Sequence, residues 1–318
     1  MRRTRLSIVC LPGLDNFLQW VEPIGVYFDT KIFIVKTNDD IIQAIGWGDV
    51  IWCEWANESA MGVTRFLAQT KNKSKRVIVR LHSYEAFTNF PENINWDYVN
   101  EIVYVAEHVA HIINTWHNLL QINTRHKIHC VPNGVDINKI QLNKPGTGFN
   151  ICSVGGISHK KNPEMMLQIF KKLADLEDNY RFHIAGAYQD SRYELYLNHM
   201  TTVLGLAEKT VYYGNVTDMD TFYKGKDFIL LCSPHEGHNV SVIEAMARGI
   251  CPVVHNYYGA DKQYDRIKVL FDTIDDAVYI IRNNTIEPIQ HREFVIGRKW
   301  TLENQVKSFV DIINGVKR

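Results

Sequence analysis

The stretch 227–256, DFILLCSPHEGHNVSVIEAMARGICPVVHN, constrains the fold more than any other part of this chain. Its short apolar run at 228–232, bounded by polar residues, predicts a buried strand. A polar, glycine-containing turn follows, and apolar residues then recur at helical spacing from 240 to 247. A second apolar strand at 252–255 completes a strand–turn–helix–strand unit. Such a unit is typical of a parallel sheet.

The turn inside this stretch predicts a ligand site. Asn239 is a good N-cap for the helix, and Gly249 would end it. Ligands of such sheets bind beyond the carboxyl ends of the strands, where turn amides and the helix N-terminus attract anions. The turn also contains an acid, Glu236, and the helix contains Glu244. Carboxylates beside an anion site make sense if the ligand also carries hydroxyl groups, as a sugar nucleotide does.

Strands and helices alternate along both halves of the chain, which predicts an α/β fold with helices on both faces of parallel sheets. The expected strands are 6–11, 31–37, 49–55, 76–82, 101–105 and 127–131 in the first half and 149–154, 181–185, 211–213, 228–232 and 252–254 in the second. The Pro- and Gly-rich segment 143–148 is the best linker. A length of 318 residues fits two domains. We therefore predict two doubly wound, Rossmann-like domains, 1–143 and 144–299, facing each other across a cleft.

The stretch VGGISHKKNP, 154–163, is the second informative one. A strand ends there, and Gly155 and Gly156 allow close backbone approach. Lys160 and Lys161 then precede a helix that should start near Pro163. A lysine at a strand–helix turn suits a phosphate, as a point charge with three donors. The alternative is that the two lysines are a solvated lead-in to the helix.

The run EGHNVSVIEAMARG, 236–249, resembles the Glu-x7-Glu motif of retaining GT-B glycosyltransferases of the family 4 type. The resemblance implies an acceptor-side first domain, a nucleotide-sugar-binding second domain, and a C-terminal helix, 300–318, that crosses back onto the first. It also implies that Glu236 binds hydroxyls of the transferred sugar and that Glu244 holds the ribose hydroxyls. The backbone amides that would bind sugar and phosphate belong to His238, Asn239 and Val240.

The glycine and lysine stretch is similar to the family's V-G-R-L-x-x-x-K-G segment, and this places Lys161 at the lysine that neutralises the diphosphate leaving group. The family's arginine falls at Gly156, so either the diphosphate is held less firmly or a second cation comes from elsewhere. The candidates for that cation are Lys160, His159 and Arg80. The triplet GNV, which contains Gly214 and Val216, looks like the family's G-x-V turn near the nucleotide base.

Several residues of the first half would face the acceptor side. His82 ends a strand and is similar to the family histidine that reaches the transferred sugar, although a lone histidine there is also compatible with a structural role. Gly13 follows the first strand and would give room for a phosphate or acceptor. Glu54 and Trp55 end the third strand and would line an acceptor pocket; the alternative is an aromatic packing position beside a surface acid. Arg80 lies at the same edge.

Composition and charge argue against several functional classes. Lys+Arg and Asp+Glu are both 35, whereas a protein that binds duplex nucleic acid usually has a basic excess. No apolar run reaches the roughly 18–20 residues of a membrane-spanning helix, and the basic N-terminus allows at most peripheral contact with acidic lipid. The six cysteines lack a metal-binding spacing and fall mostly in expected strands. They predict buried, reduced thiols and a cytoplasmic protein.

We expect no metal site and no cofactor. The triplet 218–220, DMD, superficially matches the Asp-x-Asp metal motif of GT-A transferases, but it precedes an apolar helical pattern. Asp218 or Thr217 is better placed as the cap of that helix. No Cys/His constellation suited to zinc is present in the sequence. The diphosphate would then be bound by lysine and backbone amides alone.

The resemblance thus implies a retaining, metal-independent glycosyltransferase that uses a UDP- or GDP-sugar. Two alternatives remain: a non-catalytic sugar-nucleotide-binding subunit, and another GT-B enzyme such as a nucleotide-sugar epimerase or a phosphorylase. The acceptor stays open among lipid-linked glycan, polysaccharide, protein and modified nucleobase, and so does the oligomeric state.

Overall fold

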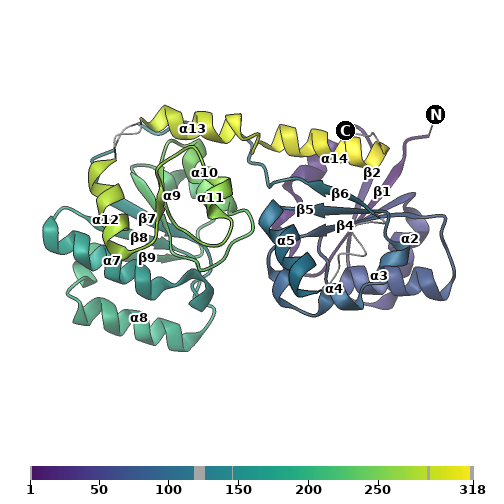
Figure 1. The fold of residues 1–318 in the computed structure, drawn as a ribbon, viewed down its shortest axis with the longest axis horizontal. Coiled ribbons are helices and arrows are strands. Elements are labelled where there is room, and N and C mark those ends of the chain that lie inside the picture. The colour runs from purple at the N-terminus through teal and green to yellow at the C-terminus, as the bar shows by residue number, and fades with distance from the viewer. Residues whose placement is uncertain (1, 118–125, 145, 285–286, 316–318) are drawn as a thin grey trace. The chain divides into compact units, whose positions relative to one another are not determined.

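The computed structural model describes residues 2–117, 126–144, 146–284 and 287–315. These residues divide into two units, each built on a six-stranded parallel sheet (Figure 1). Unit 1 consists of Met1–Gly134 and Leu302–Arg318, and unit 2 of Val135–Thr301. Strands and helices alternate through both units, so the expected α/β fold is confirmed.

The sheet of unit 1 has the strand order β2-β1-β3-β4-β5-β6, with all neighbouring strands parallel. The strands are β1 (Arg5–Cys10), β2 (Asp29–Ile34), β3 (Val50–Cys53), β4 (Arg76–Leu81), β5 (Glu101–Tyr104) and β6 (Lys127–Cys130). The α-helices are α1 (Val21–Ile24), α2 (Asn38–Trp47), α3 (Glu58–Gln69), α4 (Phe90–Asn93), α5 (Glu107–Trp116) and α14 (Leu302–Asn314). Short 3-10 helices lie at Asp15–Trp20, Tyr84–Phe87 and Trp96–Tyr98.

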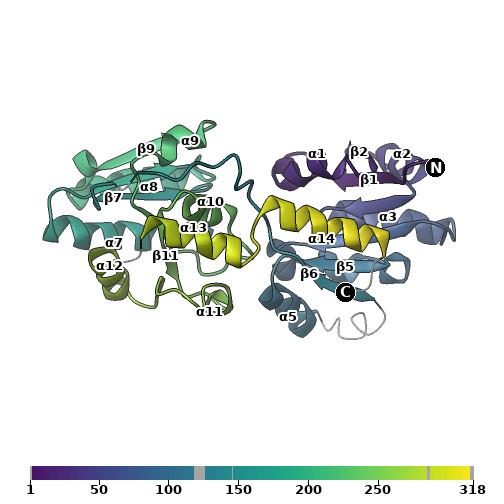
Figure 2. The same ribbon diagram turned by 90° about the horizontal axis from the view of Figure 1, so that it is seen from above.

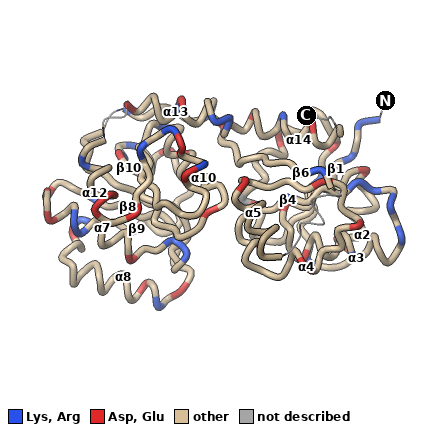
Figure 3. The backbone as a smooth tube through the Cα atoms, in the orientation of Figure 1, with Lys and Arg blue, Asp and Glu red and all other residues tan. Residues whose placement is uncertain are grey.

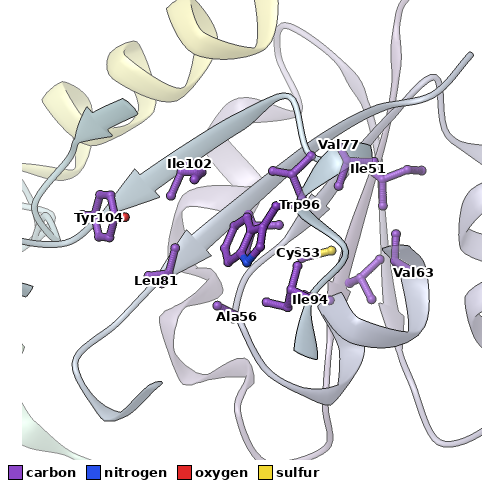
Figure 4. Close-up of a cluster of buried hydrophobic side chains, with 14 of the residues drawn as sticks. Ile51, Cys53, Ala56, Val63, Val77, Leu81, Ile94, Trp96, Ile102 and Tyr104 are labelled. Atoms are coloured by element: carbon purple, nitrogen blue, oxygen red, sulfur yellow. The ribbon is translucent and has the colours of Figure 1, made fainter. Parts of the chain in front are cut away.

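Helices cover both faces of this sheet, because successive strand residues point to opposite sides. On one face Ile51 of β3 joins a core cluster with residues of α2, α3 and α5, part of which is shown in Figure 4. On the other face Trp52 packs against α14, where its ring centroid lies 4.5 Å from that of Phe309. The C-terminal helix therefore belongs to the core of unit 1.

The sheet of unit 2 has the strand order β12-β11-β10-β7-β8-β9, again all parallel. The strands are β7 (Asn150–Val154), β8 (Arg181–Ala185), β9 (Thr210–Gly214), β10 (Phe228–Leu231), β11 (Cys251–His255) and β12 (Leu270–Phe271). The α-helices are α7 (Pro163–Leu176), α8 (Ser191–Val203), α9 (Met219–Tyr223), α10 (Val240–Ala247), α11 (Ala260–Gln263), α12 (Ile274–Asn283) and α13 (Pro288–Gly297). Two 3-10 helices lie at His159–Lys161 and Ala207–Lys209.

Unit 2 is also doubly wound. Phe170 of α7 and Ile281 of α12 pack in the core cluster on one face of the sheet. Met246 of α10 and Val295 of α13 pack in the cluster on the other face, and Figure 2 shows α13 beside α10. Both signs of charge are spread over the described parts of both units (Figure 3).

The boundary between the units follows residue 134 rather than the expected residue 143. Val135 already belongs to a core cluster of unit 2. The guanidinium group of Arg292 in α13 donates to the carbonyl oxygens of Ile137 and Ile140 at 2.7 and 2.8 Å. The Pro- and Gly-rich composition marked an irregular segment correctly, but composition does not tell which core such a segment packs on.

Other differences are small. A 3-10 helix, Asp15–Trp20, follows β1, and the two-residue strand β12 was not among the expected strands. Five of the six free cysteines are buried, and Cys130 is exposed. In the described parts of the chain, no helix combines the length and the apolar character needed to cross a membrane.

Candidate functional site

The residues expected to bind the donor lie where β7 and β10 are neighbours in the sheet of unit 2. The sheet continues from β7 through β8 and β9 on one side, and from β10 through β11 and β12 on the other. This is the topological switch point, at whose carboxyl edge open parallel sheets bind ligands. Gly155 directly follows β7, and Glu236 lies in the turn after β10. The fold therefore brings the two informative sequence stretches together.

The turn after β7 is shaped by close backbone packing. Gly155 has a φ of +138°, and a Cβ added there would lie 3.2 Å from Cε of Lys161. Gly186, after β8, has a φ of +149°, and its Cβ would lie only 1.9 Å from the carbonyl oxygen of Gly155. The turns after β7 and β8 approach each other so closely that no Cβ fits between them at position 186. Only glycine is therefore compatible with this position.

Lys161 is held in place by the start of α7. It ends a 3-10 turn, and the next residue, Asn162, adopts a left-handed conformation with a φ of +51°. The Asn162 side chain caps α7 by accepting from the backbone N–H of Met165, and Pro163 occupies the first helical position. The expected helix start near Pro163 is confirmed. The cap fixes the direction in which the Lys161 side chain leaves the turn.

Lys161 and Glu236 form an ion pair, with Nζ 2.6 Å from Oε1. Ser233 also donates its hydroxyl to this oxygen, from 2.8 Å. The Glu236 side chain is only 8% exposed, whereas that of Lys161 is 21% exposed. Burial raises the pKa of Glu236, but the charges of Lys161 and Lys160 outweigh it and hold this pKa below its ordinary value. Glu236 is therefore an ionised, oriented carboxylate.

The turn between Glu236 and α10 is held by Gln263, the last residue of α11. Gln263 donates its side-chain amide to the carbonyl oxygen of Gly237 and accepts from the Tyr257 hydroxyl at 3.0 Å. Asn239 caps α10 by accepting from the backbone N–H of Val242 at 3.1 Å, as expected. The expected amides of His238, Asn239 and Val240 thus stand at the start of a helix, where the backbone dipoles favour an anion.

Glu244 lies on α10 and is partly exposed. Burial raises its pKa, the carboxylate of Asp220 adds to this, and Arg248 opposes it. Arg248 is held by an ion pair with Asp220 and by donating to the Glu244 carbonyl oxygen at 3.0 Å. A carboxyl group in this setting gains from hydrogen-bond donors such as ribose hydroxyls, because they compensate for its lost hydration.

The predicted nucleotide turn begins with Gly214, the last residue of β9. Gly214 has a φ of +63° and accepts a hydrogen bond from the backbone N–H of Gly186 at 2.7 Å. Val216 packs against the core cluster of unit 2 that includes α10. The turns after β7, β8, β9 and β10 therefore line one edge of the sheet, and every donor-binding residue predicted from sequence belongs to one of them or to α10.

In unit 1 the predicted acceptor residues form a buried polar cluster at the carboxyl edge of its sheet. Glu54 and Arg80 are fully buried and paired, with Arg80 Nη1 2.6 Å from Glu54 Oε1. Arg80 also donates to the side-chain oxygen of Asn133 at 2.6 Å, and Trp52 donates to Glu54 at 2.8 Å. The alternative interpretation of Glu54 as a surface acid is wrong: its side chain is fully buried, and Arg80 compensates its charge. Neither side chain is exposed to a ligand in this structure.

His82 is attached to this cluster. Its Nε2 lies 3.3 Å from Glu54 Oε1, and its ring stacks on Trp55 with centroids 3.9 Å apart. Burial and the charge of Arg80 lower the pKa of His82 to about 4, although Glu54 opposes this shift. The neutral ring then donates from Nε2 to Glu54. Glu85, which the sequence analysis missed, accepts from the backbone N–H groups of His82 and Ala56, both at 3.1 Å.

The remaining predictions concern Gly13, metals and the residues that were missed. Gly13 has a φ of +77° and open space where a Cβ would lie, so its need for glycine is conformational. Asp218 caps α9 by accepting from the N–H of Thr221 at 3.0 Å, so its expected capping role is confirmed. In the described ranges no group of three His, Cys, Asp or Glu residues is arranged to hold a metal. Ser233 was missed, although its place at a strand end just before Glu236 was a usable signal.

Residues 135–273 match the family model described as Glycosyl transferases group 1. The matched segment covers most of unit 2, including the turns described above. An uncharacterized glycosyltransferase of Sulfolobus islandicus rod-shaped virus 1 is 25% identical over 170 residues, which are 51% of this chain and 44% of that relative. This chain thus matches less than half the length of its curated relative.

Solved structures show the same fold. HepE of Anabaena, in complex with UDP and glucose, superimposes with a TM-score of 0.78 at 12% identity, covering 98% of this chain and 100% of that one. Sucrose-phosphate synthase of Thermosynechococcus elongatus gives a TM-score of 0.78 at 9% identity, covering 99% of each chain. TarM of S. aureus gives 0.67 at 16% identity, covering 83% of this chain and 55% of that one. The fold is GT-B.

Proposed function

We propose that this protein is a retaining, metal-independent glycosyltransferase that moves a sugar from a UDP- or GDP-sugar to a hydroxyl acceptor. The observation that carries the proposal is the Lys161–Glu236 ion pair at the switch point of unit 2. It combines a cation for a diphosphate with a carboxylate for sugar hydroxyls. The match of this unit to group 1 glycosyltransferases supports the proposal, and so do neighbours solved with UDP, such as HepE and TarM.

Each site residue has a role in this proposal. Lys161 stabilises the negative charge that grows on the diphosphate as its bond to the sugar carbon breaks. Glu236 accepts hydrogen bonds from sugar hydroxyls, and Glu244 accepts them from the ribose. The start of α10 binds sugar and phosphate through its amides.

The chemistry needs no protein nucleophile. The bond between the sugar carbon and the phosphate oxygen breaks, and a bond to the acceptor oxygen forms on the same face of the sugar. The departing phosphate oxygen takes the acceptor's proton, so atoms and charge balance. Lys161, Lys160 and the α10 N-terminus supply positive charge to the diphosphate, so no metal is required in the proposal.

A thermal-shift screen against UDP-, GDP-, ADP- and CMP-sugars in EDTA tests the proposal. We expect one nucleotide sugar to stabilise the wild type, and a smaller shift with both Lys161→Ala and Glu244→Ala, because linkage makes the shift report affinity. Lys209→Ala, a substitution away from these turns, is the matched control. If no sugar nucleotide shifts the melting temperature, or if the site variants respond like wild type, the proposal is wrong.

A second candidate is a non-catalytic sugar-nucleotide-binding subunit. It is favoured by one observation: Gly156 carries no side chain at the place of the family arginine, and the charge of Lys161 is already balanced by Glu236. Such a subunit would bind the donor but would not release the nucleoside diphosphate from it. Incubating the donor found in the screen with a panel of hydroxyl acceptors, and following diphosphate release, separates the two functions.

A further inference from the structure

Two neighbouring glycines each lie beneath one polar side chain in the turn after β7. A Cβ at Gly155 would lie 3.2 Å from Cε and 3.7 Å from Nζ of Lys161. A Cβ at Gly156 would lie 2.5 Å from Nε2 and 3.0 Å from Cδ of Gln189. The side-chain amide of Gln189 therefore occupies the space into which a side chain at Gly156 would extend. Lys161, at the end of this turn, and Gln189, in the loop after β8, thus lie over neighbouring residues of the same turn.

Gln189 is held at this turn by its backbone. Its N–H donates to the carbonyl oxygen of Ile157 at 3.0 Å, and the neighbouring Tyr188 forms a parallel β-bridge with Ile157. The close contact of Gly186 with Gly155 fixes the start of the same loop. Gln189 itself is exposed, so its amide is accessible to a ligand. The loop after β8 thus delivers a hydrogen-bond donor to the turn after β7.

We propose that Gln189 is a donor-binding residue whose side-chain amide donates a hydrogen bond to the diphosphate beside Lys161. This inference rests on the proposed function. A primary amide offers two N–H donors and no charge, so it can satisfy a phosphate oxygen without adding a cation. The turn after β7 would then bind the diphosphate with one lysine and one neutral amide. The absence of a side chain at Gly156 and the position of the Gln189 amide depend on each other, because a larger residue at 156 would have to displace Gln189.

Titration of the nucleoside diphosphate selected by the screen, in EDTA, tests this with variants at both positions. Gln189→Ala should weaken binding about five- to tenfold, as expected for one hydrogen bond to a charged group that is partly exposed. Gln189→Glu keeps the shape but turns the donor into an anion, so it should weaken binding more than alanine does. Gln43→Glu, an exposed glutamine on α2 in unit 1, makes the same charge change and should have no effect.

Gly156→Arg combined with Gln189→Ala provides a rescue. Gly156 does not have the positive φ of its neighbour, so arginine is compatible with its backbone, and removal of the Gln189 amide frees the space. The double variant should bind the diphosphate at least as tightly as wild type and with a steeper salt dependence, because a cation replaces a neutral donor.

The outcomes separate this inference from the proposed function. If Lys161→Ala weakens diphosphate binding while Gln189→Ala and Gln189→Glu bind like wild type, the inference is overturned and the proposed function stands. If the wild type binds no nucleoside diphosphate, both are overturned. Graded losses in the order Gln189→Ala and then Gln189→Glu, with recovery in the double variant, support the inference.

Discussion

Lys161 Nζ lies 2.6 Å from Glu236 Oε1, and the two residues come from turns that follow neighbouring parallel strands. The pair therefore lies within one unit and is set by the register of one sheet. It keeps Glu236 ionised despite burial. A diphosphate would compete with Glu236 for the lysine, and the carboxylate would then be available to sugar hydroxyls. The same contact thus orients both groups that the proposed reaction uses.

Lys161→Ala should lower the rate of sugar transfer by roughly two to three orders of magnitude. A lysine about 4 Å from a phosphate charge contributes on the order of 4 kcal/mol at an effective dielectric constant near 20. Most of this acts on charge that grows in the transition state, and about 1.4 kcal/mol corresponds to a tenfold change in rate. Single-turnover measurement of diphosphate release checks this, with Lys160→Ala as the control that should lose less. A loss below about fivefold would contradict the role of Lys161.

Glu54→Leu should destabilise the protein by about 3–5 kcal/mol, because it leaves the fully buried guanidinium group of Arg80 without its counter-charge. Arg80→Met alone should cost a similar amount. The double variant Glu54→Leu, Arg80→Met should recover much of the loss, because no buried charge then remains. Urea unfolding of the four proteins of this cycle measures the coupling. Additive losses would show that the two charges do not compensate each other.

Gly186→Ala should disrupt the carboxyl edge of the unit 2 sheet, where the turns after β7 and β8 approach each other. The new Cβ would lie 1.9 Å from the backbone carbonyl oxygen of Gly155, which cannot move aside as a side chain can. Gly205→Ala is a matched control, since Gly205 also has a positive φ, of +68°, but open space around it. We expect Gly186→Ala to cost at least about 2 kcal/mol more than the control. Equal melting temperatures of the two variants would contradict the close approach of these turns.

His291→Leu should stabilise the protein, most of all in mild acid. His291 is 1% exposed, and neither ring nitrogen has a hydrogen-bond partner in the part of the chain that the structure describes. Burial lowers its pKa from 6.5 to about 4. Between these values the unfolded chain binds a proton that the folded protein does not, so stability falls as the pH drops from 6.5 to 4, by up to about 1.4 kcal/mol per pH unit.

Urea unfolding at pH 7.5 and at pH 5 tests this prediction. His291→Leu should be about 1 kcal/mol more stable than wild type at pH 7.5, because a buried group without hydrogen bonds is removed. The difference should be larger at pH 5. His183, whose pKa burial also lowers to about 4, keeps its contribution in both proteins. A difference that shrinks toward acid pH would contradict the assignment of a neutral, buried His291.

The sequence was most informative where one local pattern determines a local structure. The apolar runs gave β8 at its observed bounds and most other strands within two residues, and Asn239 and Asp218 were recognised as caps from their neighbours alone. The turns after β7 and β10 were recognised because the glycine, lysine and glutamate residues that mark each of them lie within a few positions of one another. In a parallel sheet, residues that follow different strands meet at the same edge, so the pairing of Lys161 with Glu236 follows from topology once the switch point is known.

Contacts between distant segments could not be predicted in the same way. The burial of Glu54 depends on Arg80 and Asn133, which lie far along the chain and carry no shared pattern. The position of Gln189 over Gly156 depends on a loop whose path is set by Gly186. The unit boundary depends on Arg292 of α13, which donates hydrogen bonds to the irregular segment that contains Ile137 and Ile140. In each case the structure is determined by a tertiary contact between residues distant in the sequence, and such a contact cannot be predicted from local periodicity.

The most direct test of the account is calorimetric titration of nucleoside diphosphates into the wild type and Lys161→Ala, with EDTA present throughout. We expect saturable binding of UDP or GDP to the wild type at one site, and binding to Lys161→Ala that is at least about tenfold weaker. Absence of binding by either diphosphate, or equal affinity of the two proteins, would contradict it.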